Sequence, residues 1–168
     1  MGKVFHVDKQ IANKNVEDSI TEWTKVVKDD DINAENRLFG GRLMEWIDEA
    51  AGVAGMRHCG GNVVTLMVDS LKFKHGAYIN DIVVLIAKVT YVGRTSMEVR
   101  VDTYVEDKPS GIRRAINHAY LTCVRVDDDG RPTPIEYGIK PTTISEQIEY
   151  EGAQKRIAIR KQRTVEGF

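Results

Sequence analysis

The chain has 168 residues, of which 42% are hydrophobic and 29% are charged, and its formal net charge is −1. This is the composition of one ordinary globular domain, and the near-neutral charge gives no reason to expect nucleic acid or a membrane as a partner. No apolar run approaches the ~18 residues of a membrane helix, and there is no secretory signal. We therefore expect a cytoplasmic protein whose two cysteines, Cys59 and Cys123, are reduced and without metal-ligand spacing.

The first 41 residues contain an arm, a predicted strand and a polar loop that ends in two glycines. Residues 1–16 are polar and without periodicity, which predicts a flexible or edge-lying N-terminal arm. Residues 19–28 are rich in Ile, Thr, Trp and Val and predict a first strand. An acidic triplet at residues 29–31 ends this strand before a polar loop, which carries Asn33 and ends in Gly40–Gly41.

The segment after Gly41 has a strong helical pattern. Apolar residues recur there at the spacing of one helix face, at Leu43, Ile47, Ala50, Ala51 and Ala54. Asp48 belongs neither to this face nor to the polar side, and glycines follow it at positions 52 and 55. Because glycine inside a helix costs up to about 1 kcal/mol relative to alanine, these glycines suggest that another backbone or a ligand comes close.

Two interpretations of Asp48 are open. It is a solvated or salt-bridged acid at the edge of a buried helix, or it is a catalytic carboxylate in a cleft. Gly40–Gly41 supports the second interpretation, because glycines at a helix entry let free N–H groups face a ligand. Such donors suit an anion or a developing oxyanion.

His58 lies at the end of the same helix. A protonated imidazole there would interact favourably with the C-terminal end of the helix dipole. We interpret His58 as structural.

Four strand-like runs follow a turn at residues 59–62 and occupy residues 63–74, 82–92, 95–105 and 113–126. The later connections are short, which favours antiparallel pairing, because parallel neighbours need crossovers of about a dozen residues. The acidic run Asp127–Gly130 lacks calcium-ligand spacing and predicts a turn. One helix against one face of such a sheet gives an α+β domain.

Residues 141–168 predict a separate helical tail. Thr143, with Glu146 three residues later, is typical of a capping box at a helix start. Basic residues near the other end complement the helix dipole, at Lys155, Arg156, Arg160, Lys161 and Arg163. They form a solvated face, or they contact a nucleotide phosphate or a neighbouring subunit.

Over roughly residues 17–140 the chain resembles the hotdog-fold acyl-CoA thioesterases. The matching residues are Asn33, Phe39–Gly41, Asp48–Glu49, Arg57–His58, Val64–Thr65 and Gly93–Glu98. The family places its loop asparagine fifteen residues before its aspartate, which selects Asn33. The family has glycine three residues after that asparagine, where this chain has Asn36. Asparagine tolerates positive φ, so the same turn is expected.

The resemblance implies a curled antiparallel sheet wrapped around one long central helix, which is the hotdog fold, and acyl-CoA as the substrate. It implies Asp48 as the general base or, less favoured, as the nucleophile, and Asn33 as the residue that orients water or the thioester carbonyl. The N–H groups at Gly40 and Gly41 would form the oxyanion hole. It also places coenzyme A near Thr65, Arg94, Thr95 and Ser96, although the last three are equally typical of a hairpin turn.

The resemblance also implies that each site is built from two protomers. Phe39 to Asp48 spans about 13.5 Å of helix, so the Asn33 loop of the same chain would have to fold back along about three turns. A two-fold partner can supply Asn33 more easily. We expect a homodimer, within a hexamer that is a trimer of dimers.

No metal or other cofactor is expected, because a thioester is already activated and coenzyme A is part of the substrate. The alternative is a module that binds acyl-CoA without turnover, which would not need the Asn33 and Asp48 pair. A hotdog dehydratase is not supported, because the helix has no histidine before His58.

Overall fold

The computed structural model describes residues 12–167. In chain order they form β1 (Ala12–Asn15), the 3₁₀ turn η1 (Val16–Ser19), β2 (Thr21–Val26), the 3₁₀ turn η2 (Asp29–Asp31), α1 (Gly40–Cys59), β3 (Asn62–Phe73), β4 (Ile82–Val92), β5 (Ser96–Glu106), β6 (Arg113–Val126), β7 (Tyr137–Lys140) and α2 (Ile144–Glu166). Each strand and helix expected from the sequence is present. None of the helices in this described part combines the length and the apolar character needed to cross a membrane.

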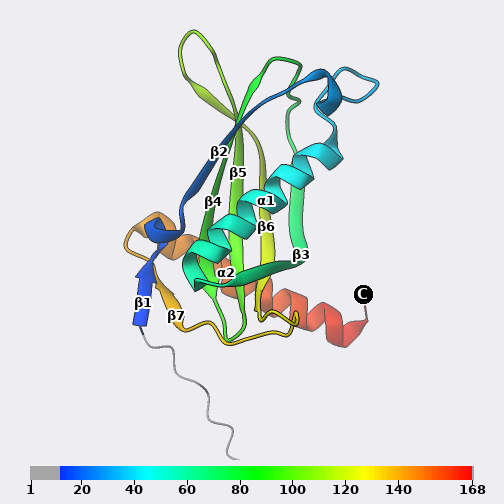
Figure 1. Cartoon of the computed structure of the whole chain (residues 1–168). Helices are drawn as coiled ribbons and strands as arrows, with labels where there is room; N and C mark the ends of the chain where they lie inside the picture. The colour runs from blue at the N-terminus through cyan, green and yellow to red at the C-terminus, as the bar shows by residue number, and fades with distance from the viewer. Residues whose placement is uncertain (1–11, 168) are drawn as a thin grey trace, which may run out of the picture.

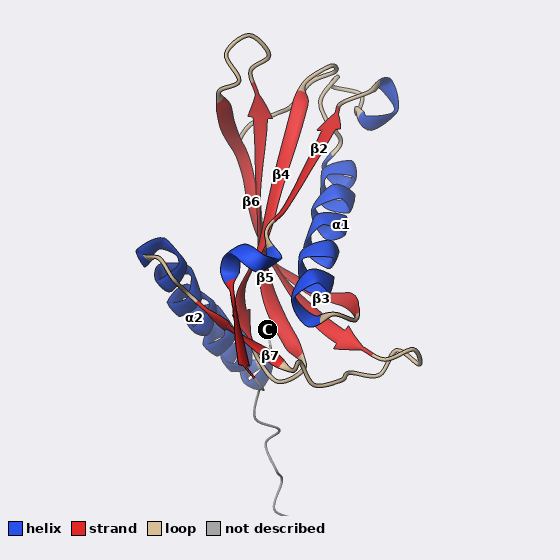
Figure 2. Cartoon of the chain, turned by 60° about the vertical axis from the view of Figure 1, so that its left-hand side comes forward, coloured by secondary structure: helices blue, strands red, loops and turns tan. Residues whose placement is uncertain are grey.

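The main sheet has five strands in the order β2-β4-β5-β6-β3, and all neighbours are antiparallel. The sheet curls around α1, which lies along its concave face (Figure 1). The second helix, α2, lies on the opposite side of the sheet (Figure 2). The predicted α+β class and hotdog fold are therefore confirmed.

The core lies between α1 and the concave face. The buried side of α1 begins with the large residues Leu43, Trp46 and Ile47 and continues with small ones, of which Ala50, Ala51 and Ala54 are fully buried. These small side chains let the helix lie close to the strands. Gly55 allows a still closer approach, because it has no side chain. A Cβ atom at position 55 would lie 3.2 Å from the side chain of Val63. At Gly52 a Cβ atom would meet nothing within 4 Å, so only Gly55 is explained by packing within this chain.

Part of the segment expected to be an N-terminal arm is ordered. Ala12–Asn15 forms β1 and pairs in parallel with β7, which the sequence pattern did not predict. Lys14 Nζ donates a hydrogen bond of 2.7 Å to the carbonyl of His58 and ties β1 to the end of α1. Residues 1–11 lie outside the described residues.

The helical tail begins as predicted, but its cations do not form one solvated face. The Thr143 hydroxyl accepts a hydrogen bond from the Glu146 N–H, and the Glu146 carboxylate accepts one from the Thr143 N–H, which completes the capping box. Arg156 and Arg160 pair with carboxylates on the sheet. The solvated interpretation is therefore wrong for these two arginines, because acidic residues on β3 and β5 meet them.

Candidate active site

The site is organised around the N-terminus of α1. The N-cap residue is Phe39, whose side chain has no acceptor, so no side chain caps the first N–H groups of the helix. Gly40 and Gly41 form the start of this first turn. A Cβ atom at position 41 would lie 2.5 Å from the ring of Phe39, so any larger residue there would displace the ring. Within the described residues, the first backbone donors of the helix are therefore not used by a side-chain cap.

Asp48 is exposed on α1 and lines a cavity of about 310 Å³. The other residues around this cavity are mostly apolar and come from α1, β3 and β6: Gly41, Met44, Glu45, Ile47, Val68, Leu71 and Leu121. The cavity thus combines a carboxylate, the helix N-terminus at Gly41 and apolar walls. Pockets that bind small molecules commonly have this mixture of apolar lining and few polar groups.

Asn33 lies elsewhere in the same chain. It lines a second cavity of about 320 Å³, together with Gly40 and residues after β3 that include His75. Its Oδ1 atom accepts hydrogen bonds from the N–H groups of Glu35 (2.9 Å) and Arg37 (3.2 Å). The carboxamide oxygen is therefore engaged by its own loop, and the Nδ2 amide remains as the donor.

The turn that holds Asn33 is the expected one. Asn36 has φ of 56°, in the left-handed region that asparagine tolerates better than most residues. The substitution of asparagine for the family's glycine at position 36 is thus compatible with this loop.

Thr65 lies on β3, near the buried thiol of Cys123. The Thr65 Oγ1 and Cys123 Sγ atoms are 4.0 Å apart. Burial, with a smaller effect from the charge of Asp48, raises the pKa of Cys123 to about 12, while the contact with Thr65 opposes the shift. Cys123 is therefore a neutral thiol on β6, next to Thr65 on β3.

Arg94, Thr95 and Ser96 lie far from the Asn33 loop, although the register places the start of β5 only two strands from Thr65, because Cys123 pairs with both Met97 and Thr65. They lie at the hairpin between β4 and β5, where the carbonyls of Arg94 and Thr95 accept hydrogen bonds from Ile135 and Arg125. The Asn33 loop pairs instead with the segment before β4, through the bridge of Arg37 to Tyr78. Because β4 has 11 residues, the two regions lie about 35 Å apart along the strand.

His58 is fully buried, and its Nε2 atom donates to the carbonyl of Tyr137 at 3.0 Å. Burial lowers its pKa, and the nearby charge of Lys14 lowers it further. The folded protein therefore favours the neutral imidazole, because burial disfavours the charged form. The carbonyl contact is consistent with a structural role.

Three residues of the Asp48 cavity were missed by the sequence reasoning, namely Val68, Leu71 and Leu121. The available signal was in residues 66–68 of β3, which are all apolar and therefore put apolar side chains on both faces of the strand. Within residues 12–167, no group of three or more His, Cys, Asp and Glu residues is arranged to hold a metal ion.

The sequence itself matches a known group of proteins over the segment that carries α1 and the first strands of the sheet. Residues 35–112 match the Thioesterase superfamily. The class of protein that the fold and the cavity define is thus a hotdog thioesterase.

Curated relatives narrow this class. An uncharacterized acyl-CoA thioester hydrolase of Bacillus subtilis, YkhA, is 38% identical over 133 residues, which cover 79% of this chain and 77% of the relative. The protein VdlD of Helicobacter pylori is 36% identical over 76% of this chain and 72% of its own length. The chain belongs to the acyl-CoA thioester hydrolase family.

Solved structures agree with this assignment. An acyl-CoA hydrolase from Staphylococcus aureus, in complex with butyryl coenzyme A and coenzyme A, is 34% identical, with a TM-score of 0.85 over 92% of this chain and 93% of that one. A hexameric acyl-CoA thioesterase is 38% identical, with a TM-score of 0.87 over 92% and 98% of the two chains.

The staphylococcal enzyme has also been solved with alanine in place of an aspartate, an asparagine or a threonine. In that protein the asparagine lies 15 residues before the aspartate and the threonine lies 17 residues after it. Asn33, Asp48 and Thr65 have the same residue types at the same spacing.

Proposed function

We propose that this protein hydrolyses acyl-CoA thioesters to a free carboxylic acid and coenzyme A, with Asp48 as the general base. The observation that carries the proposal is that Asp48 and Gly41 line one apolar cavity. A thioester placed there has a base, a set of backbone donors and room for part of its acyl group.

The reaction needs three events at the carbonyl carbon. Asp48 removes a proton from a water molecule as the water oxygen attacks that carbon. The carbonyl oxygen becomes an oxyanion, which the N–H groups at Gly40 and Gly41 stabilise. The carbon–sulfur bond then breaks, the thiol of coenzyme A leaves with the proton, and the acyl group departs as the carboxylic acid. No step in this sequence needs a metal or a cofactor.

Asn33 acts as a donor in this scheme. Its Oδ1 atom is engaged by Glu35 and Arg37, so the Nδ2 amide is the group available to a substrate. This geometry favours a hydrogen bond to the thioester carbonyl over acceptance of a proton from water. We propose that Asn33 reaches the site from the partner subunit, because in its own chain it lines a different cavity from Asp48.

The edge strand β3 supports a dimer that shares its sites. Among residues 12–167 of one chain, no strand pairs with its outer edge. It also carries exposed apolar residues, of which Leu66 is 68% exposed. An unpaired apolar edge is a ready surface for a second strand. A two-fold contact there would cover the Asp48 cavity, which Val68 and Leu71 of β3 line. We propose that such dimers assemble further into a hexamer, as the hexameric relative does.

The remaining candidate residues bind coenzyme A in this proposal. Thr65 contacts Cys123 on the neighbouring strand β6, and its counterpart by spacing is one of the positions replaced in the staphylococcal enzyme. Arg94 is exposed at a hairpin and has the charge to hold a phosphate of an extended coenzyme A, with Thr95 and Ser96 beside it.

A thiol-release assay tests the function. Purified protein is incubated with acyl-CoAs from two to eighteen carbons in the presence of a metal chelator, and free coenzyme A is measured. We expect turnover for part of the series and almost none with Asp48→Asn, which keeps the shape of the side chain but removes its basicity. A module that only binds acyl-CoA would retain ligand in equilibrium dialysis and release no thiol.

A further inference from the structure

The second helix is fixed to the outer face of the sheet by buried ion pairs. The Nε and Nη2 atoms of Arg156 donate to the two carboxylate oxygens of Glu98 at 2.9 and 2.8 Å. The Glu98 side chain is only 1% exposed and also accepts a hydrogen bond of 2.7 Å from Thr90. The Arg156 guanidinium lies 3.7 Å from the ring centre of Tyr120. These contacts hold the middle of α2 in one place.

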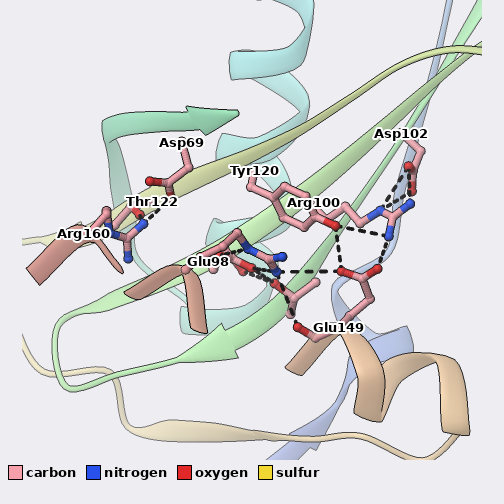
Figure 3. A network of polar contacts seen from close by, with 10 residues as sticks. Asp69, Glu98, Arg100, Asp102, Tyr120, Thr122, Glu149 and Arg160 are labelled. Atoms are coloured by element: carbon pink, nitrogen blue, oxygen red, sulfur yellow. Dashed lines mark hydrogen bonds and ion pairs between the residues drawn. The ribbon is translucent and has the colours of Figure 1, made fainter. Parts of the chain in front are cut away.

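Two further groups of contacts fix α2 on either side of Arg156 (Figure 3). On its N-terminal side, Glu149 pairs with Arg100 of β5 and accepts a hydrogen bond of 2.9 Å from the Tyr120 hydroxyl. On its C-terminal side, Arg160 pairs with Asp69 of β3 and donates to Thr122. The orientation of α2 about its own axis is therefore set, and so is the face that it turns to solvent.

That outward face carries an apolar row. Ile144, Ile148 and Ile159 are 82%, 62% and 51% exposed. Single exposed apolar residues are common on protein surfaces. Ile144 and Ile148 belong instead to one helical row of alternating four- and three-residue steps, which is the spacing that packs against another helix, and Ile159 lies beside that row. The row also includes Glu151, Lys155 and Ala158, which are exposed as well.

The charges of α2 are divided between its two halves. Residues 144–154 contain Glu146, Glu149 and Glu151 and no Lys or Arg. Residues 155–163 contain five Lys and Arg residues and no acid. Two such helices side by side in antiparallel orientation place the acidic half of each against the basic half of the other. The parallel arrangement places like charges together.

We propose that the outward face of α2 is a two-fold interface with α2 of a second copy of this chain. The helices cross antiparallel near Ala153, because Glu151 and Lys155 are each two residues from it. Glu151 then pairs with the partner subunit's Lys155, and the reverse pair forms by symmetry. Ile148 faces the partner subunit's Ala158, whose small side chain lets the two helices come close.

This interface rests on the proposed assembly beyond the dimer. A two-fold contact through β3 closes on itself and joins only two chains. Larger closed assemblies need a second surface, and α2 lies on the opposite side of the sheet from α1 (Figure 2). Two different two-fold contacts that alternate around a ring give a closed hexamer of three dimers.

Charge reversal at the two central positions tests the proposal. Glu151→Lys places lysines on all four central positions of a pair, and Lys155→Glu places glutamates there. We expect each variant alone to fall to the mass of a dimer, roughly one third of the wild-type mass, in size-exclusion chromatography with light scattering. When the two variants are co-expressed with different tags and the dimers that contain one chain of each are purified, a ring of three dimers can form in which every Lys faces a Glu, so the wild-type mass should return. Lys108→Glu, in the loop between β5 and β6, is the matched control for charge and should keep the wild-type mass.

The proposal falls if wild type and both variants have the same mass, if Lys108→Glu dissociates equally, or if the purified mixed dimers do not reassociate. Circular dichroism establishes that each variant is folded, because loss of one exposed ion pair costs at most about 1 kcal/mol. Thiol release is measured on every sample. If the wild type releases thiol but the variants keep its mass, only the α2 interface is overturned. If the masses change as expected but the wild type releases no thiol, only the proposed hydrolysis is overturned.

Discussion

Asn33 and Asp48 line different cavities of one protomer, and the first turn of α1 lies between them. Gly40 borders the cavity of Asn33, and Gly41 borders the cavity of Asp48. Two residues that the family pattern pairs therefore do not meet in one chain. A partner that supplies Asn33 across a two-fold axis resolves this separation.

Complementation between inactive variants tests the shared site. We expect Asn33→Ala and Asp48→Ala to be nearly inactive alone. A mixed dimer has one intact site and one site with both changes, so purified mixed dimers should recover about half of the wild-type activity. Random pairing makes half of the dimers mixed, so the whole pool should recover roughly a quarter. The two proteins are co-expressed with different tags, and activity is measured after tandem purification.

The control for this experiment is a mixture of wild type with the Asn33→Ala, Asp48→Ala double variant. The two models predict opposite results for its mixed dimers: neither of the two sites is intact if the site is shared, whereas one site is intact if both residues act within one chain. Verified mixed dimers without any recovered activity would mean that Asn33 and Asp48 act within one chain.

Removal of the Asp48 carboxylate should slow catalysis without unfolding the protein. We expect Asp48→Ala to lower kcat at least ~100-fold, in the range for the loss of a general base. Asp48 is exposed in the protomer, and surface substitutions usually change stability by less than about 0.5 kcal/mol. Thermal melting and thiol release are measured on one sample. Near-normal turnover in the folded variant would mean that Asp48 is not catalytic and has only a structural role.

An isotope experiment separates the general base from the nucleophile. Excess enzyme performs a single turnover in ¹⁸O-labelled water, and the product acid is analysed by mass spectrometry. A general base delivers labelled oxygen from water directly to the acyl carbon, so the first product should carry the label. Unlabelled oxygen in that product would come from the Asp48 carboxylate and would establish an acyl-enzyme anhydride.

The attachment of α2 should depend strongly on one buried ion pair. Arg156→Ala leaves the Glu98 carboxylate buried without its partner, and the loss of one member of a buried pair typically costs about 3–5 kcal/mol. The double variant Glu98→Gln, Arg156→Ala removes the uncompensated charge and should be more stable than Arg156→Ala. Urea unfolding measures both.

Arg163→Ala, on the exposed end of the same helix, is the control and should change the unfolding free energy by less than about 0.5 kcal/mol. Equal effects of Arg156→Ala and Arg163→Ala would mean that the Glu98 pair does not hold the helix.

The protein should lose stability in mild acid because of His58. Burial lowers the pKa of this histidine below its ordinary value of 6.5, so the unfolded chain binds more protons than the folded one. The contribution to stability is complete above pH 6.5 and is lost as the pH falls through the folded-state pKa. We expect Tm to decrease between pH 7.5 and 5.5, and His58→Gln to reduce this dependence. His75→Gln, at an exposed histidine, should leave it unchanged, and an equal effect of both substitutions would rule out His58 as the source.

The order of the main strands and helices follows from periodicity, because each long element shows its buried face as a repeat in the sequence. Residues 82–92 and 113–126 were predicted with the bounds of β4 and β6. The short pair of β1 and β7 was missed, since four residues are too few for a repeat and their hydrogen bonds come from the other end of the chain.

The residue types of the candidate site were also readable from the sequence. Asn33, Gly40, Gly41 and Asp48 are marked by spacing, and the loop conformation by Asn36. The positions of these groups relative to one another were not readable, because spacing along the chain does not determine which residues share a cavity. The tertiary structure separates Asn33 from Asp48 and adds Val68, Leu71 and Leu121 to the walls around the carboxylate.

The cations of α2 show most clearly which features follow from the sequence and which depend on the tertiary structure. The sequence by itself determined a capped helix with a basic C-terminal half, because capping and dipole effects act within a few residues. Only the tertiary structure decided that Arg156 is held by the buried carboxylate of Glu98 while Lys155, next to it in the chain, faces solvent. The reason is rotational: successive residues of a helix point about 100° apart, and the packing of α2 on the sheet selects which of them is buried.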